Sequence, residues 1–132
     1  DIGIFAAAVS DFKNRNIKRT KIKKNSELNI NFTKNIDILE TVGKSKKLRP
    51  KFLVGFAAET GNISNAKNKL VKKNCDMIVY NKINDSNKVF GSEFNKISII
   101  TKNGIKNYKK MTKINCAKII LKYIYSNRLI NE

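Results

Sequence analysis

The sequence predicts an α/β fold in which a mostly parallel sheet lies between two layers of helices. Three near-continuous apolar runs, at residues 1–9, 52–56 and 76–80, are typical of strands that are buried on both faces. Segments with apolar residues at helical spacing separate these runs, and strands that alternate with helices indicate parallel pairing. An Asn-Gly pair at residues 103–104 lies between two further apolar runs and predicts a tight β-hairpin.

The first third of the chain contains two predicted strands and one predicted helix. The apolar run Asp1–Val9 predicts a strand, and the polar, basic segment Ser10–Lys24 predicts a loop. Apolar and polar residues alternate over 28–33, which is the period-two pattern of a half-exposed strand. Apolar residues at helical spacing then predict a helix over Asn35–Lys46, with Asn35 as its N-cap.

The centre of the chain predicts a strand–helix–strand unit. A turn at Arg49-Pro50 leads into the buried strand at 52–56, and a helix is expected over Asn62–Asn74. The third buried strand is expected at Asp76–Tyr80, followed by a polar loop over residues 81–94. The inner face of the helix is predicted to consist of Ile63, Ala66 and Leu70.

The last third predicts the hairpin over Lys96–Thr101 and Ile105–Tyr108, then a closing C-terminal helix over Thr112–Asn127. We expect the inner stripe of this helix to consist of Ile114, Ala117, Leu121 and Ile124. The sequence contains no repeat or linker, so we expect a single domain over residues 1–132, a three-layer Rossmann-like sandwich. Because the chain starts directly on a strand without an initiator Met, we expect the fold to be incomplete at the N-terminus.

The chain carries a formal net charge of +18, which raises the possibility of a basic nucleic-acid-binding module. Only four of the basic residues are arginines, although the planar guanidinium is the group best suited to reading bases. Lysine, asparagine and isoleucine are abundant together, and all three have AT-rich codons, so mutational bias explains the charge at least as well as function does. The charge alone therefore does not identify nucleic acid as a partner.

Histidine is absent from the sequence, which excludes histidine-based catalytic triads and nearly all zinc sites. Cys75 and Cys116 lack the spacing of metal ligands, and their apolar contexts predict small buried side chains in a reducing, cytoplasmic setting. No apolar run in the sequence approaches the roughly 20 residues that a membrane-spanning helix needs.

Parallel sheets bind ligands at the carboxyl ends of their strands, so we expect a site at the loops after Val9, Phe56 and Tyr80. The small residues 6–8 allow a ligand to approach the backbone closely. Asp11 then supplies a carboxylate for a metal ion or a ribose hydroxyl. An ordinary solvent-exposed aspartate and tight packing of the alanines would explain the same residues.

Basic residues suited to phosphate groups occur in two places. Residues 21–24, KIKK, form a dense positive patch, and Lys69 and Lys73 are four residues apart on one face of the predicted helix. Both features are also compatible with an ordinary lysine-rich surface. Phe56, at the end of its strand, could pack against a base or a ribose, but an ordinary core position would explain it equally. The sequence contains no P-loop, dinucleotide fingerprint or nucleophile elbow.

Taken in order, these segments closely resemble the bacterial phosphopantothenate–cysteine ligase family, over residues 2–129. The chain is similar to the carboxy-terminal part of the ligase domain, which is often the ligase half of a bifunctional decarboxylase/ligase. The matching segments are AAAVSDF (6–12), KIKK (21–24), KNIDIL (34–39), FLVGFAAET (52–60), KLVKKNCDMIVYN (69–81) and FGSEFNKISIIT (90–101).

The resemblance implies a cytoplasmic enzyme of coenzyme A biosynthesis that forms a C–N bond. CTP would activate the carboxylate of 4'-phosphopantothenate as an acyl-cytidylate, and the amine of cysteine would displace CMP. It also implies Mg²⁺, a homodimer formed through the ligase domain, and FMN only where a decarboxylase domain is fused upstream. A nucleic-acid-binding module and a Rossmann-like domain for another nucleotide remain the alternatives.

The resemblance also assigns roles to individual residues. Lys21 would contact the reacting phosphate and acyl-cytidylate region as the catalytic residue, and Asp11 would contact CTP or its magnesium ion. The remaining CTP contacts that it implies are Phe5, Ala6, Ala7, Ile36, Asp37, Ile38, Leu39, Phe56, Lys69 and Lys73.

Three residues depart from the family pattern. Ile36 stands where the family usually has Pro, and Ser10 and Tyr80 replace common alanines, the second placing a bulky ring near the active face. The amino-terminal part of the family's domain, with the Asn that handles the acyl-cytidylate, has no counterpart in these residues. We therefore expect the isolated chain to show little or no turnover.

Overall fold

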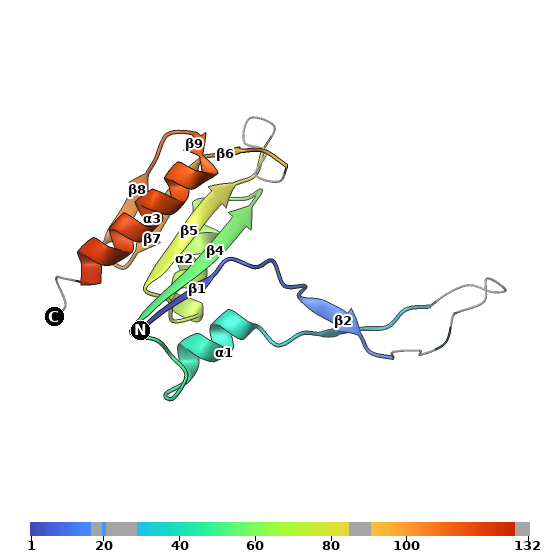
Figure 1. Ribbon diagram of the computed structural model, residues 1–132. Helices are drawn as coiled ribbons and strands as arrows, with labels where there is room; N and C mark the ends of the chain where they lie inside the picture. The colour runs from blue at the N-terminus through green and yellow to red at the C-terminus, as the bar shows by residue number, and fades with distance from the viewer. Residues whose placement is uncertain (17–19, 21–28, 85–90, 129–132) are drawn as a thin grey trace.

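The structure is a computed structural model that describes residues 1–16, 20, 29–84 and 91–128. A five-stranded sheet forms its centre, with helices packed on both faces (Figure 1). The sheet strands are β1 (Ile2–Phe5), β4 (Phe52–Glu59), β5 (Met77–Lys82), β7 (Ile97–Thr101) and β8 (Gly104–Asn107). The helices are α1 (Ile38–Lys44), α2 (Ile63–Lys72) and α3 (Lys113–Arg128). Two short ribbons pair β2 (Phe12–Asn14) with β3 (Phe32–Lys34), and β6 (Phe94–Asn95) with β9 (Met111–Thr112).

The strand order in the sheet is β1-β4-β5-β7-β8. β1, β4 and β5 pair in parallel, whereas β7 and β8 are antiparallel to their neighbours. This arrangement confirms the predicted α/β sandwich with parallel central strands, a hairpin and a closing helix. It also places the carboxyl ends of three successive parallel strands at one edge of the sheet.

The core has two parts, one on each face of the sheet. On one face Cys116, Ile120 and Ile124 of α3 pack against buried residues of the central strands, among them Val54 and Val79. On the other face, Ala66 and Leu70 of α2 pack against strand residues that include Ala57, Ile78 and Ile100. Successive strand residues point to opposite faces, so these strands are apolar throughout because both faces are covered.

The first strand differs from its prediction in length and in burial. β1 ends at Phe5 rather than Val9, and Ile2 and Ile4 are 42% and 45% exposed. These two side chains are in register with Phe52 and Val54, on the face that α3 covers further along the sheet. Since α3 packs over β5 and β7, the same face of β1 stays open in the described part of the chain.

The segment predicted as a loop over Ser10–Lys24 contains a strand. β2 pairs antiparallel with β3, and the backbone bonds Arg15 N–H to Asn31 O and Asn35 N–H to Asp11 O extend the ladder at both ends. The half-exposed strand predicted at 28–33 is therefore real but begins at Phe32 among the described residues. The ribbon projects away from the sheet, as Figure 1 shows.

The first helix begins later than predicted and has a different N-cap. Asp37, not Asn35, caps α1, because its Oδ1 accepts a hydrogen bond of 3.0 Å from the backbone N–H of Glu40. The Asn35 side chain instead donates to the carbonyl oxygen of Ser10 at 2.9 Å. A carboxylate at this position also interacts favourably with the helix dipole.

The inner stripe predicted for the closing helix is wrong in three of its four positions. Ile114 and Leu121 are 69% and 58% exposed, and Ala117 is also exposed; only Ile124 is buried. Cys116 and Ile120 take the inner positions together with Ile124, at a spacing of four residues. Apolar residues surround much of α3, so the periodicity of the sequence does not choose between the two stripes.

The hairpin is confirmed, with its turn one position earlier than expected. Thr101 pairs with Gly104, so Lys102 and Asn103 form the turn. Gly104 has a φ of +137°, a conformation that side chains with a Cβ rarely adopt. The polar loop predicted over 81–94 is shorter, because Asn81 and Lys82 extend β5 and Phe94 belongs to β6.

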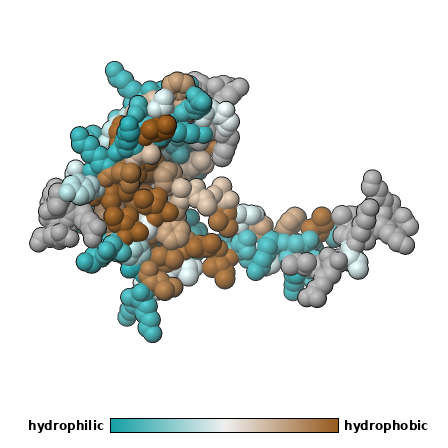
Figure 2. All heavy atoms as spheres, viewed as in Figure 1, coloured by the Kyte–Doolittle hydropathy of each residue, from teal (hydrophilic) through white to brown (hydrophobic). Residues whose placement is uncertain are grey.

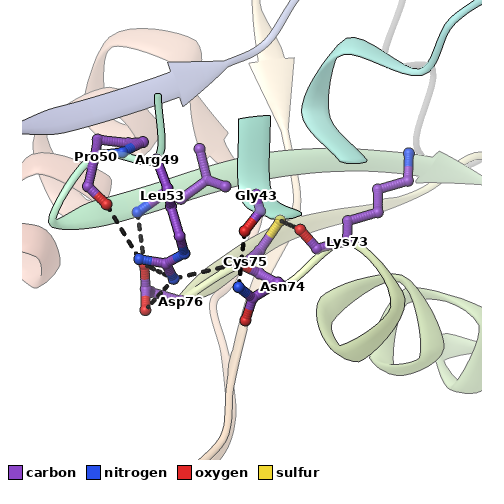
Figure 3. Close-up of polar contacts among 8 residues, drawn as sticks. All are labelled: Gly43, Arg49, Pro50, Leu53, Lys73, Asn74, Cys75 and Asp76. Atoms are coloured by element: carbon purple, nitrogen blue, oxygen red, sulfur yellow. Dashed lines mark hydrogen bonds and ion pairs between the residues drawn. The ribbon is translucent and has the colours of Figure 1, made fainter. Parts of the chain in front are cut away.

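A charged clamp fixes the amino ends of β4 and β5 (Figure 3). Asp76 accepts hydrogen bonds from the Arg49 guanidinium at 2.9 and 3.0 Å, and its Oδ2 also accepts one from the Leu53 N–H at 2.7 Å. The guanidinium donates further to the carbonyl oxygens of Pro50 and Asn74. The turn predicted at Arg49-Pro50 is thus tied to the residue that ends the loop after α2.

We expect Asp76→Ala to lower the free energy of unfolding by about 2–3 kcal/mol, because it leaves the Leu53 N–H and the Arg49 guanidinium without their acceptor. Urea denaturation followed by circular dichroism would measure the loss. Glu40→Ala is the matched control, since it removes an exposed i,i+4 pair with Lys44 that contributes little. Equal losses in the two variants would contradict this account.

Both cysteines are free thiols, and the predicted burial is confirmed for Cys116 but only in part for Cys75. Cys116 is 5% exposed within the α3 core, and Cys75 is half-buried beside Gly55 of β4. Burial raises the pKa of Cys75 to about 11, against the weaker opposite effect of Lys73. Because the thiolate is the reactive form, Cys75 is an unreactive structural thiol.

In a Cys116→Ala background, we expect Cys75 to react roughly 100-fold more slowly with iodoacetamide at pH 8 than a free cysteine does, because the raised pKa lowers the thiolate fraction. Mass spectrometry of timed samples would measure the rate. Denaturation in urea should restore a normal rate. Fast alkylation of the folded protein would show that Cys75 is not buried as described.

Candidate functional site

A cleft of about 970 Å³ opens at the carboxyl ends of the parallel strands, where the sequence predicted a site. Its floor consists of the ends of β1 and β4, with Phe56, Ala57 and Ala58 contributed by β4. The loop after β1, the start of α1, one face of α2 and the first turns of α3 form its walls. The volume lies at the upper end of the range for sites that bind small molecules and cofactors.

The cleft brings together all the predicted site residues that the structure describes. They come from four separate elements of the chain, which only the fold makes neighbours. The lining includes Phe5, Ala6, Ala7, Asp11, Ile36, Asp37, Ile38, Leu39, Phe56, Lys69 and Lys73. Lys21 and the rest of the KIKK segment lie outside the described residues, so the role of Lys21 stays a prediction.

Lys69 of α2 and Lys73, the C-cap of this helix, line the cleft, and each forms an ion pair with a carboxylate. Lys69 Nζ lies 2.5 Å from Glu59 Oε1 at the end of β4, and Lys73 Nζ lies 2.8 Å from Asp37 Oδ2. The four-residue spacing places both ammonium groups on one face of the helix, as predicted. The carboxylates hold these groups in place and compensate their charge when no anion is bound.

Asp37 has two functions in this wall. Its Oδ1 caps α1 and its Oδ2 pairs with Lys73, so one carboxylate joins the start of α1 to the end of α2. Partial burial acts to raise the pKa of Asp37, but the hydrogen bonds from Lys73 and from the Glu40 N–H outweigh it and hold the pKa below its usual range. Asp37 is therefore a carboxylate at neutral pH.

The close approach of α1 to α2 depends on Gly43. A Cβ at this position would lie 1.9 Å from the carbonyl oxygen of Lys73, so only glycine fits there. Asn74, which has a left-handed φ of 51°, donates its side-chain N–H to the carbonyl oxygen of Gly43 at 2.7 Å. This contact brings the Asp37 end of α1 and Lys73 into the same wall.

The three departures from the family pattern are accommodated locally. Tyr80 does not reach the cleft, contrary to expectation: it points toward α2, and its hydroxyl donates to the carbonyl oxygen of Gly61 at 3.2 Å. The Ser10 hydroxyl donates to the carbonyl oxygen of Phe12 at 2.7 Å and fixes the start of β2. Ile36 is 70% exposed on the cleft rim, and the Asp37 cap starts α1 without a proline.

Sequence reasoning missed several polar residues of the cleft, including Lys34, Asn81, Asn95 and Lys113. Asn81 could have been found, because it directly follows a predicted strand whose carboxyl end was expected to face the ligand. Asn95 and Lys113 lie on β6 and at the start of α3, and only the tertiary structure brings them to the cleft. Four lysines and two aspartates line the cleft among the described residues, which favours an anionic ligand.

Apolar side chains gather near the cleft on the surface between α1 and α3, over β1 and β4 (Figure 2). Ile2, Ile4 and Leu121 are among the exposed apolar residues of these elements. A contiguous patch of exposed apolar side chains usually contacts another segment or another molecule.

Comparison with known proteins decides the family. Residues 1–127 match the family described as the DNA/pantothenate metabolism flavoprotein C-terminal domain. The chain belongs to this family. The resemblance found from the motifs is thereby confirmed, since this family model and relatives named as the coenzyme A biosynthesis bifunctional protein CoaBC match the chain.

The chain is 45% identical over 129 residues to the coenzyme A biosynthesis bifunctional protein CoaBC of Borreliella burgdorferi, covering 95% of this chain and 32% of that protein. It is also 45% identical over 127 residues to a cysteine/cysteine sulfinic acid decarboxylase from an unknown prokaryotic organism, covering 94% of this chain and 35% of that protein. The chain thus spans about a third of the length of these relatives.

The fold matches the crystal structure of the C-terminal domain of a coenzyme A biosynthesis bifunctional protein CoaBC, with a TM-score of 0.73 and 31% identity. The match covers all of this chain and 56% of that one. Within the described ranges, the helices are too short or too polar to cross a membrane. The same residues contain no cluster of three or more potential metal ligands of the His, Cys, Asp or Glu types.

We expect Asp37→Asn to weaken the dependence of stability on acid pH. The pKa of Asp37 is lower in the folded chain than in the unfolded chain, so its stabilising effect is present above pH 4 and is lost as the pH falls through the folded pKa. Urea denaturation between pH 7 and pH 3 should give a shallower acid decline for the variant. Identical declines for the variant and the unaltered protein would contradict the proposed pairing with Lys73.

Proposed function

We propose that this chain forms part of a CTP-dependent phosphopantothenate–cysteine ligase of coenzyme A biosynthesis. The observation that carries the proposal is that eleven residues predicted to contact CTP line a single cleft, although they come from separate segments of the chain. Membership of the family and the names of its relatives support the same activity.

In the first step a carboxylate oxygen of 4'-phosphopantothenate attacks the α-phosphorus of CTP. The bond to the β-phosphate breaks, pyrophosphate leaves and an acyl-cytidylate forms. Lys69 and Lys73 are positioned to bind the triphosphate, because their ammonium groups lie on the same wall of the cleft. Ile36, just before α1, and Ile38, its first residue, contact the cytidine together with the backbone of residues 5–7, which lines the same cleft.

The residues present fit a magnesium ion that is carried by the nucleotide. Asp11 supplies one exposed carboxylate on the cleft wall, and Mg²⁺ in nucleotide sites is usually held by one or two carboxylates together with phosphate oxygens and water. Such an ion would neutralise charge on the departing pyrophosphate. Asp11 would bind the ion, and Lys69 and Lys73 would bind the phosphate oxygens.

In the second step the amine of cysteine attacks the acyl carbon. CMP leaves, the amine loses a proton, and the new C–N bond is an amide. The mixed anhydride makes this step possible because CMP is a far better leaving group than the oxygen of a free carboxylate. The protein contributes chiefly by holding the reactants together.

The projecting β2–β3 ribbon supports the proposal of a homodimer. Phe12 and Phe32 are 59% and 64% exposed on it, and an isolated two-stranded ribbon is at best marginally stable in water. Packing against a second copy would cover these aromatic side chains.

The family membership does not favour the alternative of a nucleic-acid-binding module. The low activity expected of the isolated chain stays a prediction.

The proposal is tested with the full-length protein that contains this chain. We expect CTP to raise its melting temperature more than ATP does at equal concentration. Lys69→Ala and Asp11→Ala should weaken CTP binding, the lysine variant by roughly tenfold or more because it removes a charge-assisted contact. Lys21→Ala, in the KIKK segment, should also reduce CTP binding.

Lys67→Ala is the matched control, since Lys67 lies on the same helix but on its exposed side, away from the cleft. It should leave CTP binding unchanged. Equal stabilisation by CTP and ATP, or equal effects of Lys67→Ala and Lys69→Ala, would contradict the proposed nucleotide site.

A further inference from the structure

Two buried asparagines lie on the α3 side of the cleft, outside the set of residues predicted to contact CTP. Asn81 at the end of β5 is 5% exposed, Asn95 in β6 is 8% exposed, and both line the cleft. Since Tyr80 points toward α2, its neighbour Asn81 points to the opposite face of the sheet. On that face the Cys116 thiol of α3 contacts the carbonyl oxygen of Asn95 at 3.9 Å.

The two side chains form an amide pair with unused acceptor capacity. Asn95 Nδ2 donates to Asn81 Oδ1 at 2.9 Å, whereas Asn95 Oδ1 is buried and has no hydrogen-bond partner in the described structure. Each amide oxygen can accept two hydrogen bonds. Buried acceptors are rarely left unpaired, because the lost hydration is costly. The pair therefore suits a ligand group that donates hydrogen bonds.

We propose that this amide pair binds the attacking amine of the amino-acid substrate, an inference that rests on the proposed ligase function. A neutral amide oxygen accepts a hydrogen bond from an amine and favours its protonated form less than a carboxylate does. A carboxylate in the same place would stabilise the ammonium ion, which has no lone pair with which to attack. The acidic residues that line the described cleft, Asp11 and Asp37, belong instead to the loop after β1 and to α1.

The amide pair lies on the other side of the cleft from the lysines proposed to bind the triphosphate. Lys69 and Lys73 lie on the α2 side, where their charge suits phosphate groups. The surroundings of the amides on the α3 side are mostly apolar, with Ile83, Ile97, Ala117 and Ile120 also lining the cleft. The terminal torsion of asparagine is broad, so the Asn95 amide can rotate to present its covered Oδ1 to an entering donor.

The two half-reactions of the full-length protein test the inference. Pyrophosphate release from CTP and phosphopantothenate without cysteine reports the first step, and amide formation with varied cysteine reports the second. We expect Asn95→Leu and Asn81→Leu each to raise the KM for cysteine by about tenfold, and to leave pyrophosphate release within about twofold. Asn107→Leu, which removes an exposed asparagine on β8 that bonds Ser98, is the matched control and should change neither step.

Asn95→Asp provides a second readout that does not depend on truncating a buried side chain. It keeps the size of the side chain and the Oδ1 acceptor, replaces the Nδ2 donor that bonds Asn81 with a second oxygen, and adds a negative charge. We expect the pH at which the second step is half-maximal to rise, because the charge holds the amine in its protonated form, while the first step keeps its pH profile.

Several results would overturn the inference. An unchanged KM for cysteine in both leucine variants, or an unshifted pH profile in Asn95→Asp, would show that the pair does not bind the amine. Parallel loss of both steps in variants that unfold at the normal temperature would assign the pair to the nucleotide or the acid. Absence of pyrophosphate release in the unaltered protein would instead refute the proposed function, and the inference with it.

Discussion

The candidate site depends on the contact between α1 and the end of α2. Gly43 allows the backbones of the two helices to meet, and the amide of Asn74 joins them. Because α1 is a short helix, its position is set by this contact and by Leu39 packing on Gly55 of β4, rather than by its own stability. The orientation of Asp37, and through it of Lys73, follows from where α1 is held.

The sheet supplies the second constraint. Parallel strands need long crossover connections, and the crossovers after β1 and β4 both leave from the carboxyl ends of these strands. Residues 6–11, 56–58 and 81 are far apart in the sequence but follow or end neighbouring strands, so they meet at the cleft. The clamp of Arg49 and Asp76 lies at the opposite ends of β4 and β5. The clamp and the candidate site therefore lie at opposite ends of the same strands.

The sequence predicted most of this arrangement where its signals were strong. The strands β4 and β5, the inner face of α2 and the hairpin followed from runs and spacing that have one reading, but the length and exposure of β1 did not. Lys69 and Lys73 followed from helical geometry. α3 could not be oriented, since Ile114 and Leu121 are as apolar as Ile120 and Ile124. The Asp37 cap was missed because Asn35 is an equally good cap in sequence. The amide pair required tertiary structure, because its members are fourteen positions apart in the sequence.

The open face of β1 has a consequence for handling the protein. In the described structure β1 is an edge strand that pairs only with β4, and its Ile2 and Ile4 side chains are exposed. An edge strand that has unpaired backbone groups and exposed isoleucine side chains can pair with a strand from another molecule. A preparation of these 132 residues by themselves should accordingly be prone to aggregate as its concentration rises, and longer versions that cover this edge should be easier to keep in solution.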